Sequence, residues 1–315
     1  MNILIMGAGA LGSVFGGFLS RTNDVVLVGR DPHIEAINRK GLRISGIWGE
    51  HTFNVKAYTD TSGIESQDIV FITTKAYDTR KALEQILPLL SEESIVISMQ
   101  NGIGNEEVIE ALVGRRRTMG GMAIFGARIV SPGHVEVTVY ASECLVGSLN
   151  GDAKKSEMVA RLISEAGIPA KPSDDIIREK WMKAFYNIAL NPLSAILKVP
   201  YGMLGENEGT LAIMRSMLEE SFQVARAEGI NLRFTAEEYF RYLIEKQLPP
   251  TAKHKSSMLQ DIERGKRTEI DYLNGFIVKL GKKHGISTPV NETITNILKT
   301  MEDPKFQDVF KIKRR

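Results

Sequence analysis

The N-terminal stretch of the chain is the feature that most limits how it can fold. Asn2–Met6 is a short apolar run, and the glycine-rich segment GAGALG follows it directly at residues 7–12. Ser13–Ser20 comes next and is apolar with helical character. An apolar run that stops at glycine is typical of a buried parallel strand. The stretch therefore predicts a strand, a tight glycine turn and a helix.

The glycines of this turn have separate expected roles. Gly7 permits the tight turn, Gly9 lets a pyrophosphate approach the backbone, and Gly12 lets the helix pack closely on the strand. The N-terminus of the helix then offers free N–H groups to the phosphates. Because the turn directly follows a first strand and opens a helix, it predicts a dinucleotide site more strongly than the glycine spacing alone.

A second apolar run, Asp24–Val28, completes a strand–helix–strand unit and ends in Gly29-Arg30. A protein that binds NAD usually carries Asp or Glu here, whereas a guanidinium binds the 2′-phosphate of NADP. Arg30 therefore favours NADP. Asp31 lies beside it and weakens this preference; its alternative role is to cap the helix expected over residues 32–39.

Further polar residues follow the next two predicted strands, Asp68–Thr74 and Ser94–Met99. Lys75 and Asn101 stand at or just after their C-terminal ends. Ligands of open α/β sheets bind at these ends, so Lys75, Asn101 and Arg30 form a first cluster of candidate ligand residues. For Lys75 alone, a solvated loop lysine is an equally good interpretation.

The rest of the first half adds strands to the doubly wound pattern. We expect a hairpin over 41–55, strands over 119–125 and 135–146 with His134 at a turn, helices over 78–90 and 158–166, and a strand or connector over 167–172. Cys144 is the only cysteine, so it forms no internal disulfide and has no second thiol for a metal site. A buried place in a strand is expected for it, which fits a reducing cytosol.

After Asp174 the pattern becomes almost wholly helical. Helices are expected over 175–191, 206–229, 235–246, 251–264, 269–284 and 290–300. We therefore predict an α/β domain at 1–170 and a helical domain at 171–315. Thr268 is the expected N-cap of one helix, and Glu269 then stands in its first turn, where the dipole favours a carboxylate on the surface. Residues 311–315 are expected to be a solvated tail.

One of these helices carries a polar stripe. Lys183, Asn187 and Asn191 are four residues apart, and four residues advance a helix by about 400°, so the three side chains share one face. Apolar neighbours predict a largely buried helix, and a buried lysine is rare unless it is paired or functional. We interpret the stripe as one wall of a polar pocket; the alternative is a structural hydrogen-bond network between packed helices.

Composition excludes several other classes of protein. The 315 residues are 43% hydrophobic and 25% charged, which is ordinary for a globular chain of about two domains. A net charge of +2 is too small to argue for nucleic acid or an anionic membrane. Glycines break the first apolar run and no Lys or Arg precedes it, so we expect no signal peptide. No later segment offers the ~20 uninterrupted apolar residues that a membrane span needs, and we expect the chain in the cytoplasm. No metal site is expected, and a homodimer is left open.

Taken together, the motifs resemble the ketopantoate reductase (2-dehydropantoate 2-reductase) family over nearly the whole chain. The resemblance rests on GAGALG at 7–12, GR at 29–30, TTKAYDT at 73–79, QNG at 100–102, KxxxNxxxNP at 183–192 and SSMLQDIERGKRTEIDYLNG at 256–275. It implies a Rossmann-type α/β domain with added strands and an all-α C-terminal domain like that of 6-phosphogluconate dehydrogenase, with the site in the cleft between.

The resemblance also implies residue roles. Lys183 would be the catalytic acid, and Glu269 would complete the site around Lys183 and the cofactor. Ala127 would match a backbone contact to the cofactor. The implied NADP(H) set is Gly7, Ala8, Gly9, Ala10, Leu11, Gly12, Arg30, Lys75, Asn101, Ala127 and Glu269. The implied substrate set is Asn101, Lys183, Asn187, Asn191 and Ser257.

The activity implied is the NADPH-dependent reduction of ketopantoate to pantoate, an oxidoreductase step on CH–OH in pantothenate and coenzyme A biosynthesis. One position departs from the family pattern, which carries Asn before a glycine where this chain reads Pro200-Tyr201-Gly202. Tyr201 therefore leaves a reductase of another branched 2-oxo acid, or of an imine, as an alternative. A non-catalytic NADPH sensor is a further alternative, but it would need neither the Lys183 stripe nor Ser257.

Overall fold

The chain divides into two compact units, Met1–Ile177 and the residues from Arg178 onward. The computed structural model describes residues 1–306, so the solvated tail expected at 311–315 lies outside the described residues. The boundary expected at residue 170 falls in the first unit, where Ala170 begins the last strand of the main sheet. No helix within residues 1–306 combines the length and apolar character that crossing a membrane requires.

The first unit is built on a main sheet with the strand order β12-β11-β8-β7-β6-β1-β2-β5. All neighbouring strands pair in parallel except β8 and β11. The strands are β1 (Asn2–Met6), β2 (Asp24–Val28), β5 (Lys56–Tyr58), β6 (Gln67–Ile72), β7 (Leu90–Ser98), β8 (Thr118–Met122), β11 (Cys144–Ser148) and β12 (Ala170–Pro172). This order confirms the predicted Rossmann-type α/β arrangement with β1 inside the sheet.

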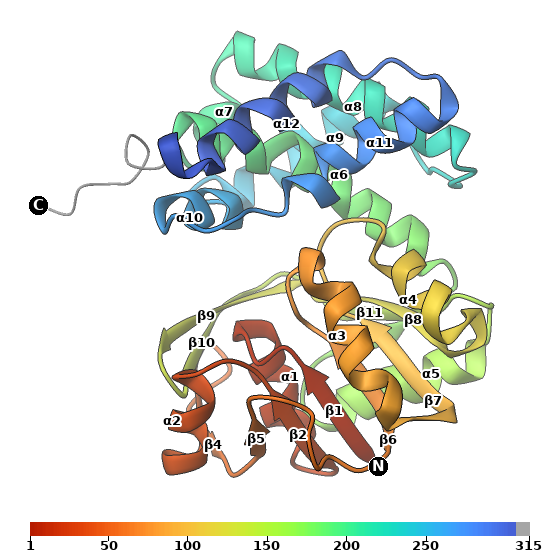
Figure 1. Ribbon diagram of the computed structural model, residues 1–315. Coiled ribbons are helices and arrows are strands. Elements are labelled where there is room, and N and C mark those ends of the chain that lie inside the picture. The colour runs from red at the N-terminus through yellow and green to blue at the C-terminus, as the bar shows by residue number, and fades with distance from the viewer. Residues whose placement is uncertain (307–315) are drawn as a thin grey trace, which may run out of the picture. The chain divides into compact units, whose positions relative to one another are not determined.

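Helices cover both faces of this sheet (Figure 1). Side chains alternate along a strand, so Ile3 and Ile5 of β1 join one core and Leu4 and Met6 join the other. The first core includes residues of α1 and α5, and the second includes residues of α3 and α4. The helices are α1 (Ala10–Leu19), α2 (His33–Lys40), α3 (Thr79–Ile86), α4 (Asn105–Val113) and α5 (Ala153–Glu165).

A second sheet packs on the outer side of α1. Its strand order is β4-β3-β10-β9, with β3 (Leu42–Gly46), β4 (His51–Phe53), β9 (Phe125–Ser131) and β10 (His134–Tyr140). α1 fits between the two sheets because Gly16 and Gly17 have no side chains and allow close packing on both sides. A Cβ on Gly16 would come within 2.3 Å of Leu27 in the main sheet, and one on Gly17 within 2.8 Å of Ile44 and Phe53 in the second.

The second sheet corrects two sequence expectations. The hairpin at 41–55 forms as antiparallel β3 and β4, but it belongs to this sheet and not to the main one. The single strand expected at 135–146 is two strands in different sheets, β10 and β11. Between them the chain turns, with Ala141 N donating to Ile124 O at 3.0 Å. His134 lies in β10, where its Nε2 is 2.7 Å from Ser45 Oγ, rather than at a turn.

Local helix chemistry also differs from expectation at two places. α2 begins at His33 with Pro32 at its N-cap, which has no side-chain acceptor, so Asp31 does not cap it. The helix expected over 78–90 is α3 flanked by short 3₁₀ turns at Ala76–Asp78 and Leu87–Leu89, and β7 begins already at Leu90. Cys144 is buried in β11, as expected.

The second unit is helical. It contains α6 (Ile176–Leu197, from Arg178 onward), α7 (Tyr201–Leu204), α8 (Glu208–Ala227), α9 (Ala236–Tyr242), α10 (Ser257–Glu263), α11 (Asn274–His284) and α12 (Pro289–Glu302), with a 3₁₀ turn η6 at Ile270–Tyr272. α10 is shorter than the expected 251–264. The helix expected over 269–284 is divided at Leu273 into η6 and α11, and the Thr268 hydroxyl accepts a hydrogen bond from Ile270 N at 3.2 Å.

α6 continues through Pro192 to Leu197 instead of ending at residue 191. Proline has no N–H, so the carbonyl of Ile188 loses its usual partner within the helix. Asn274 Nδ2 of α11 donates to this carbonyl at 3.3 Å. The Asn274 side chain, distant in sequence, thus replaces the hydrogen bond to the Ile188 carbonyl that Pro192 cannot form.

Candidate active site

The glycine turn between β1 and α1 is shaped by close backbone contacts. Gly7 has φ of +117°, and a Cβ there would lie 2.6 Å from Thr74 N. A Cβ on Gly12 would lie 2.2 Å from Gly7 O, whereas one on Gly9 would meet nothing within 4 Å. Gly7 and Gly12 are therefore required by the protein itself. Gly9 keeps the backbone open at the start of α1, where a phosphate group could approach.

Thr73 secures this turn from the neighbouring strand. Its hydroxyl donates to Gly7 O at 2.8 Å, while Gly7 N and Ala8 N both donate to Val28 O. Thr73 belongs to the TTKAYDT motif, but the motif alone predicts no role for it. The sequence places Thr73 inside the strand expected over 68–74, whereas β6 ends at Ile72, so its position just after the strand is known only from the structure.

The polar residues expected at the carboxyl edge of the sheet lie after β2, β6 and β7. Arg30 follows β2, and its side chain is 86% exposed and forms an ion pair with Asp78 at 2.9 Å. This bond joins the segment after β2 to the segment after β6 that contains the partly exposed Lys75. Asn101 is exposed after β7, and its carbonyl accepts from Asn105 Nδ2 at 3.0 Å.

Gln100 joins two of these segments. Its Nε2 donates to Thr74 O at 3.0 Å and to Thr79 Oγ1 at 2.8 Å, which ties the end of β7 to the end of β6. Ala127 occupies a different place from the one expected, because the strand predicted over 119–125 ends at Met122. Ala127 lies in β9 of the second sheet, paired with Val137.

The stripe of the second unit lies on α6 as predicted, but its burial differs. Lys183 and Asn187 are half-buried, and Asn191 is 5% exposed. The more buried lysine is Lys180, one turn earlier, at 5% exposed. Burial alone therefore does not distinguish Lys183; its alignment with the two amides does.

Two elements meet the end of the stripe at Asn191. Ser256, the N-cap of α10, donates its hydroxyl to Asn191 O at 3.3 Å, so α10 begins beside α6; the next residue, Ser257, is exposed. Tyr201 of α7 is buried and donates its hydroxyl to Asn191 Oδ1 at 2.5 Å. Neither contact is expected from the sequence, in which Ser256 has no assigned role and Tyr201 is a departure from the family pattern.

Glu269 is half-buried and directly precedes η6. Five residues later, Asn274 donates to Ile188 O, so the segment that follows Glu269 is fixed against α6 between Asn187 and Asn191. Within residues 1–306, no group of three or more His, Cys, Asp or Glu side chains is arranged to hold a metal ion.

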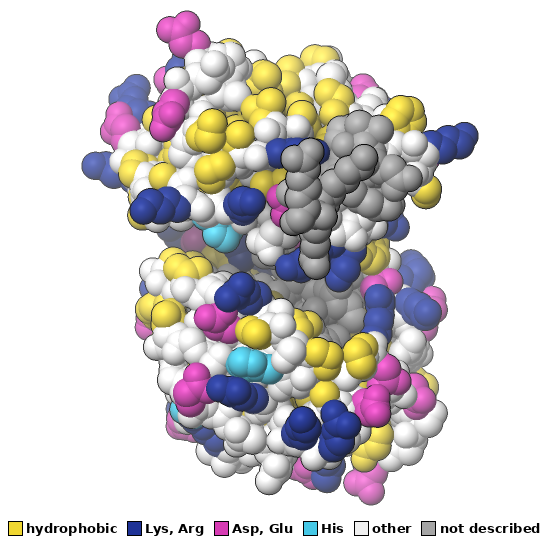
Figure 2. Space-filling view, turned by 90° about the vertical axis from the view of Figure 1, so that its left-hand side faces the viewer, with side chains coloured by type: hydrophobic (Ala, Val, Ile, Leu, Met, Phe, Trp, Pro, Cys, Tyr) yellow, Lys and Arg dark blue, Asp and Glu magenta, His cyan; other side chains and the backbone are white. Residues whose placement is uncertain are grey.

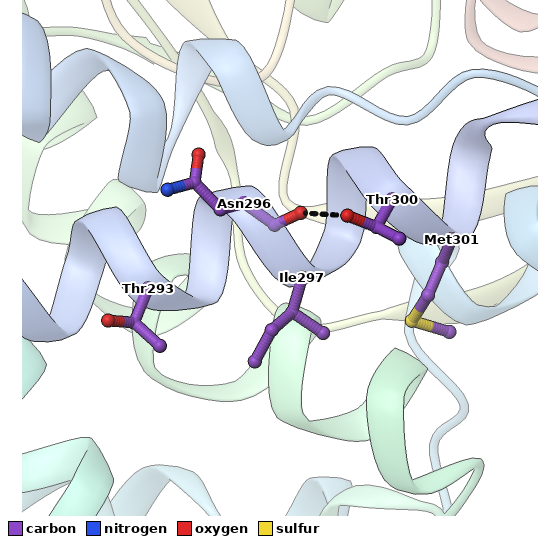
Figure 3. A pocket seen from close by; sticks show the side chains of 5 residues that line it. All are labelled: Thr293, Asn296, Ile297, Thr300 and Met301. Atoms are coloured by element: carbon purple, nitrogen blue, oxygen red, sulfur yellow. Dashed lines mark hydrogen bonds between the residues drawn. The ribbon is translucent and has the colours of Figure 1, made fainter.

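A surface pocket on α12 is separate from these clusters. Its lining side chains all belong to α12, and Thr300 Oγ1 donates to Asn296 O at 2.9 Å (Figure 3). It contains no charged side chain and none of the candidate residues, so we do not regard it as a catalytic site. Acidic and basic side chains are interspersed on the face shown in Figure 2, in keeping with the small net charge of +2.

A glycine turn of this kind on a Rossmann-type sheet, followed by a helical unit with a lysine and two aligned amides, fits the class of nicotinamide-dependent oxidoreductases. Comparison with known families gives the particular kind. The family model described as "Ketopantoate reductase PanE/ApbA" matches residues 3–151, and "Ketopantoate reductase PanE/ApbA C terminal" matches residues 175–302. The chain therefore belongs to the ketopantoate reductase family.

Individual relatives agree with this membership. The chain is 40% identical to a 2-dehydropantoate 2-reductase of Aquifex aeolicus over 96% of this chain and 97% of that protein. It is 38% identical to the corresponding protein of Archaeoglobus fulgidus over 96% and 98%. A ketopantoate reductase structure from Ralstonia eutropha is similar with a TM-score of 0.88 and 34% identity, covering 98% of this chain and 100% of that one.

A structure of D-mandelate dehydrogenase with NADH and anilino(oxo)acetate is similar to the same degree. Its TM-score is 0.88 at 32% identity, and the match covers 96% of this chain and 99% of that one. The fold is thus shared by enzymes whose names specify different acids.

Proposed function

We propose that the protein reduces 2-dehydropantoate to pantoate with NADPH, as in pantothenate and coenzyme A biosynthesis. The observation that carries this proposal is the α6 stripe, in which Lys183, Asn187 and Asn191 share one face and the start of α10 meets Asn191. Such a face offers one cation and several neutral donors, which suits a small 2-oxo acid. The relatives from Aquifex aeolicus and Archaeoglobus fulgidus, both named 2-dehydropantoate 2-reductase, support the choice of substrate.

In the proposed reaction, NADPH, when bound, would supply the hydride for the C2 carbonyl carbon of the substrate. Negative charge then develops on the carbonyl oxygen, where the Lys183 ammonium stabilises it and donates a proton from Nζ. Asn187 and Asn191 donate hydrogen bonds without adding charge, and the Ser257 hydroxyl donates to a carboxylate oxygen. Glu269 completes the site around Lys183 and the cofactor.

Arg30 supports NADP as the cofactor. Its guanidinium is exposed at the end of β2, and its ion pair with Asp78 is open to solvent. An exposed ion pair contributes only about 0–1 kcal/mol, so a 2′-phosphate could compete for the guanidinium at little cost. The cofactor set in this proposal is the glycine turn, Arg30, Lys75, Asn101, Ala127 and Glu269. NAD is the competing choice, since the similar D-mandelate dehydrogenase structure holds NADH.

A reductase of a different 2-oxo acid is the second candidate. The position of Tyr201 beside Asn191 and the likeness to D-mandelate dehydrogenase favour it. A non-catalytic sensor is less well supported, because it gives no reason for the aligned lysine and amides. The homodimer and the cytoplasmic location stay predictions.

The deciding experiment follows the loss of NADPH absorbance with 2-dehydropantoate, with NADH in parallel and 2-oxo-2-phenylacetate as the competing substrate. The expected result is fast oxidation of NADPH with 2-dehydropantoate, and slow oxidation with NADH or with 2-oxo-2-phenylacetate. Faster turnover of 2-oxo-2-phenylacetate would move the assignment to the second candidate. Tight binding of NADPH without turnover of any 2-oxo acid would contradict the enzymatic proposal.

A further inference from the structure

Tyr201 lies where it controls the orientation of an amide in the substrate site. It is 3% exposed, and its hydroxyl is 2.5 Å from Asn191 Oδ1. Burial raises the pKa of the Tyr201 hydroxyl above its ordinary value, with the nearby Tyr186 adding to the rise, so the hydroxyl keeps its proton at working pH. A hydroxyl that keeps its proton can act as a donor to the amide throughout the working range.

The position of the Tyr201 ring is set by its surroundings. Tyr201 N donates to His254 O at 3.1 Å, and the next residue, Gly202, donates to Ala252 O at 2.8 Å. The ring meets Tyr186 edge-on at 5.8 Å, and the Tyr186 hydroxyl is in turn held by Thr251 at 2.8 Å. The hydroxyl is therefore presented to Asn191 by a fixed framework.

This contact decides which way the Asn191 amide faces. An amide has one acceptor oxygen and one N–H₂ group, and only the oxygen can accept the tyrosine proton. Within residues 1–306, the Tyr201 hydroxyl has no other hydrogen-bond partner, so reversing the amide would leave its proton without an acceptor. Ser256 holds the backbone of the same residue through Asn191 O at 3.3 Å.

The other end of the amide is then available to a ligand. Asn191 is only 5% exposed, yet its Nδ2 forms no hydrogen bond in the described part of the chain. Among residues 1–306, the side-chain atoms that are both fully enclosed and without a partner do not include Asn191 Nδ2. Nδ2 therefore retains access to the space beside α6. A nearly buried donor of this kind favours a ligand that supplies an acceptor.

We propose that Tyr201 is a positioning residue of the substrate site, which holds Asn191 Oδ1 so that Nδ2 donates to an oxygen atom of the 2-oxo acid. The proposal rests on the function proposed above. It assigns selectivity to the pair: a carboxylate, carbonyl or hydroxyl oxygen is favoured at this position. A reversed amide would instead place its carbonyl oxygen next to the substrate oxygen, and two acceptors cannot form a hydrogen bond.

The test compares Tyr201→Phe with Tyr186→Phe, which removes the hydroxyl that donates to Thr251 but keeps the ring that packs against Tyr201. Tyr201→Phe is expected to raise KM for the 2-oxo acid about tenfold, with a smaller change in kcat, as for a misplaced hydrogen bond in a binding site. NADPH affinity should be unchanged. An unchanged KM in Tyr201→Phe, or an equal rise in Tyr186→Phe, would overturn the proposal.

A double variant keeps the proposal testable if Tyr201→Phe alone folds poorly. Tyr201→Phe leaves Asn191 Oδ1 without a donor, whereas removing both partners leaves no buried group unpaired. In the Asn191→Ala background, Tyr201→Phe is therefore expected to have no further effect on KM. A second, additive rise in KM would show that Tyr201 acts independently of Asn191 and would contradict the proposal.

A readout without turnover separates this proposal from the proposed function. In protein labelled with ¹⁵N-asparagine, the side-chain N–H₂ signals of Asn191 are identified by their loss in Asn191→Ala. They are expected to shift in Tyr201→Phe and to remain in place in Tyr186→Phe. Unshifted signals in Tyr201→Phe would reject the role of Tyr201 even if the enzyme reduces 2-dehydropantoate. Absence of turnover with the expected shifts would reject only the proposed function.

Discussion

Lys183 is half-buried on α6 and shares its helix face with Asn187 and Asn191. In the proposed mechanism its ammonium meets charge that develops only as the carbonyl is reduced, so Lys183→Ala is expected to lower kcat by about 10²–10⁴. NADPH affinity should remain as in the unaltered protein, as measured by fluorescence titration.

The matched control for this variant is Lys282→Ala, which removes an exposed lysine paired with Glu292 in the same unit. Its kcat is expected to stay near that of the unaltered enzyme. Turnover in Lys183→Ala comparable with this control would remove Lys183 from the mechanism.

The glycines of the first turn should separate binding from stability. A Cβ on Gly9 meets nothing within 4 Å, and the backbone there has φ of −76°, which alanine also adopts. Gly9→Ala should therefore keep its melting temperature but lose about tenfold in NADPH affinity, because the methyl group occupies the approach of the pyrophosphate.

Gly12→Ala is the opposite case, since its Cβ would lie 2.2 Å from Gly7 O. It is expected to lose about 1–3 kcal/mol of unfolding free energy in a urea titration. Equal destabilisation by Gly9→Ala and Gly12→Ala would contradict the division of roles between the two glycines.

At the scale of elements, the start of α12 depends on a carboxylate from α8. Glu220 is 9% exposed and accepts hydrogen bonds from Val290 N at 2.8 Å, Asn291 N at 2.9 Å and Asn291 Nδ2 at 2.6 Å. The two backbone N–H groups belong to the first turn of α12, where no partner within the helix is available. Glu220→Ala should reduce the unfolding free energy by about 2–4 kcal/mol, because buried donors lose a charged partner.

Glu219→Ala, the exposed neighbour on the same helix, is the control and should change the unfolding free energy by less than about 0.5 kcal/mol. Denaturant titration of both variants measures the difference. Equal losses in the two variants would mean that the contact with α12 does not determine the effect.

The junction of α6 and α11 allows a test by a double-variant cycle. Asn274→Ala removes the donor to Ile188 O and should lose about 1–3 kcal/mol of unfolding free energy. In the Pro192→Ala background the new alanine N–H can pair with Ile188 O. The loss of unfolding free energy caused by Asn274→Ala should therefore be smaller in that background, by about 0.5–1.5 kcal/mol. Strictly additive losses would show that Asn274 does not compensate for Pro192.

On the scale of the whole first unit, His33 joins three elements. Its Nδ1 accepts from Gly133 N at 3.0 Å, at the turn between β9 and β10, and its Nε2 is 3.0 Å from Ser13 Oγ on α1. Burial lowers the pKa of His33 below its ordinary value of 6.5. The folded protein therefore keeps this ring neutral at a pH where the unfolded chain already binds a proton.

Because the unfolded state takes up more protons, the unfolding free energy should fall as the pH falls below about 6.5. His33→Asn keeps an acceptor for Gly133 N but does not titrate, so it should show a weaker decline between about pH 7 and pH 5. His254 also has a lowered pKa from burial and contributes the same background to both proteins. Parallel declines would exclude His33 as a source of the pH dependence.

Much of the fold and the candidate site could be predicted from local patterns. The strand–turn–helix at residues 2–20, the residues after β2, β6 and β7, and the alignment of the stripe all depend on neighbours within a few positions along the chain. The predicted breaks were less accurate. The helix expected over 175–191 continues to Leu197, and the strand expected over 135–146 is two strands, because the partners that decide both cases are distant in sequence.

By itself, the sequence determined the glycine turn, the order of elements, the lysine and amide stripe and the family, because turn chemistry and helical spacing are local properties. Only the tertiary structure decided which strands join the second sheet, which lysine is most buried, and how Asn191 is held. Tyr201, Ser256 and Asn274 reach α6 from other segments of the chain. Their hydrogen bonds depend on distances in space, and no periodicity along the chain encodes those distances.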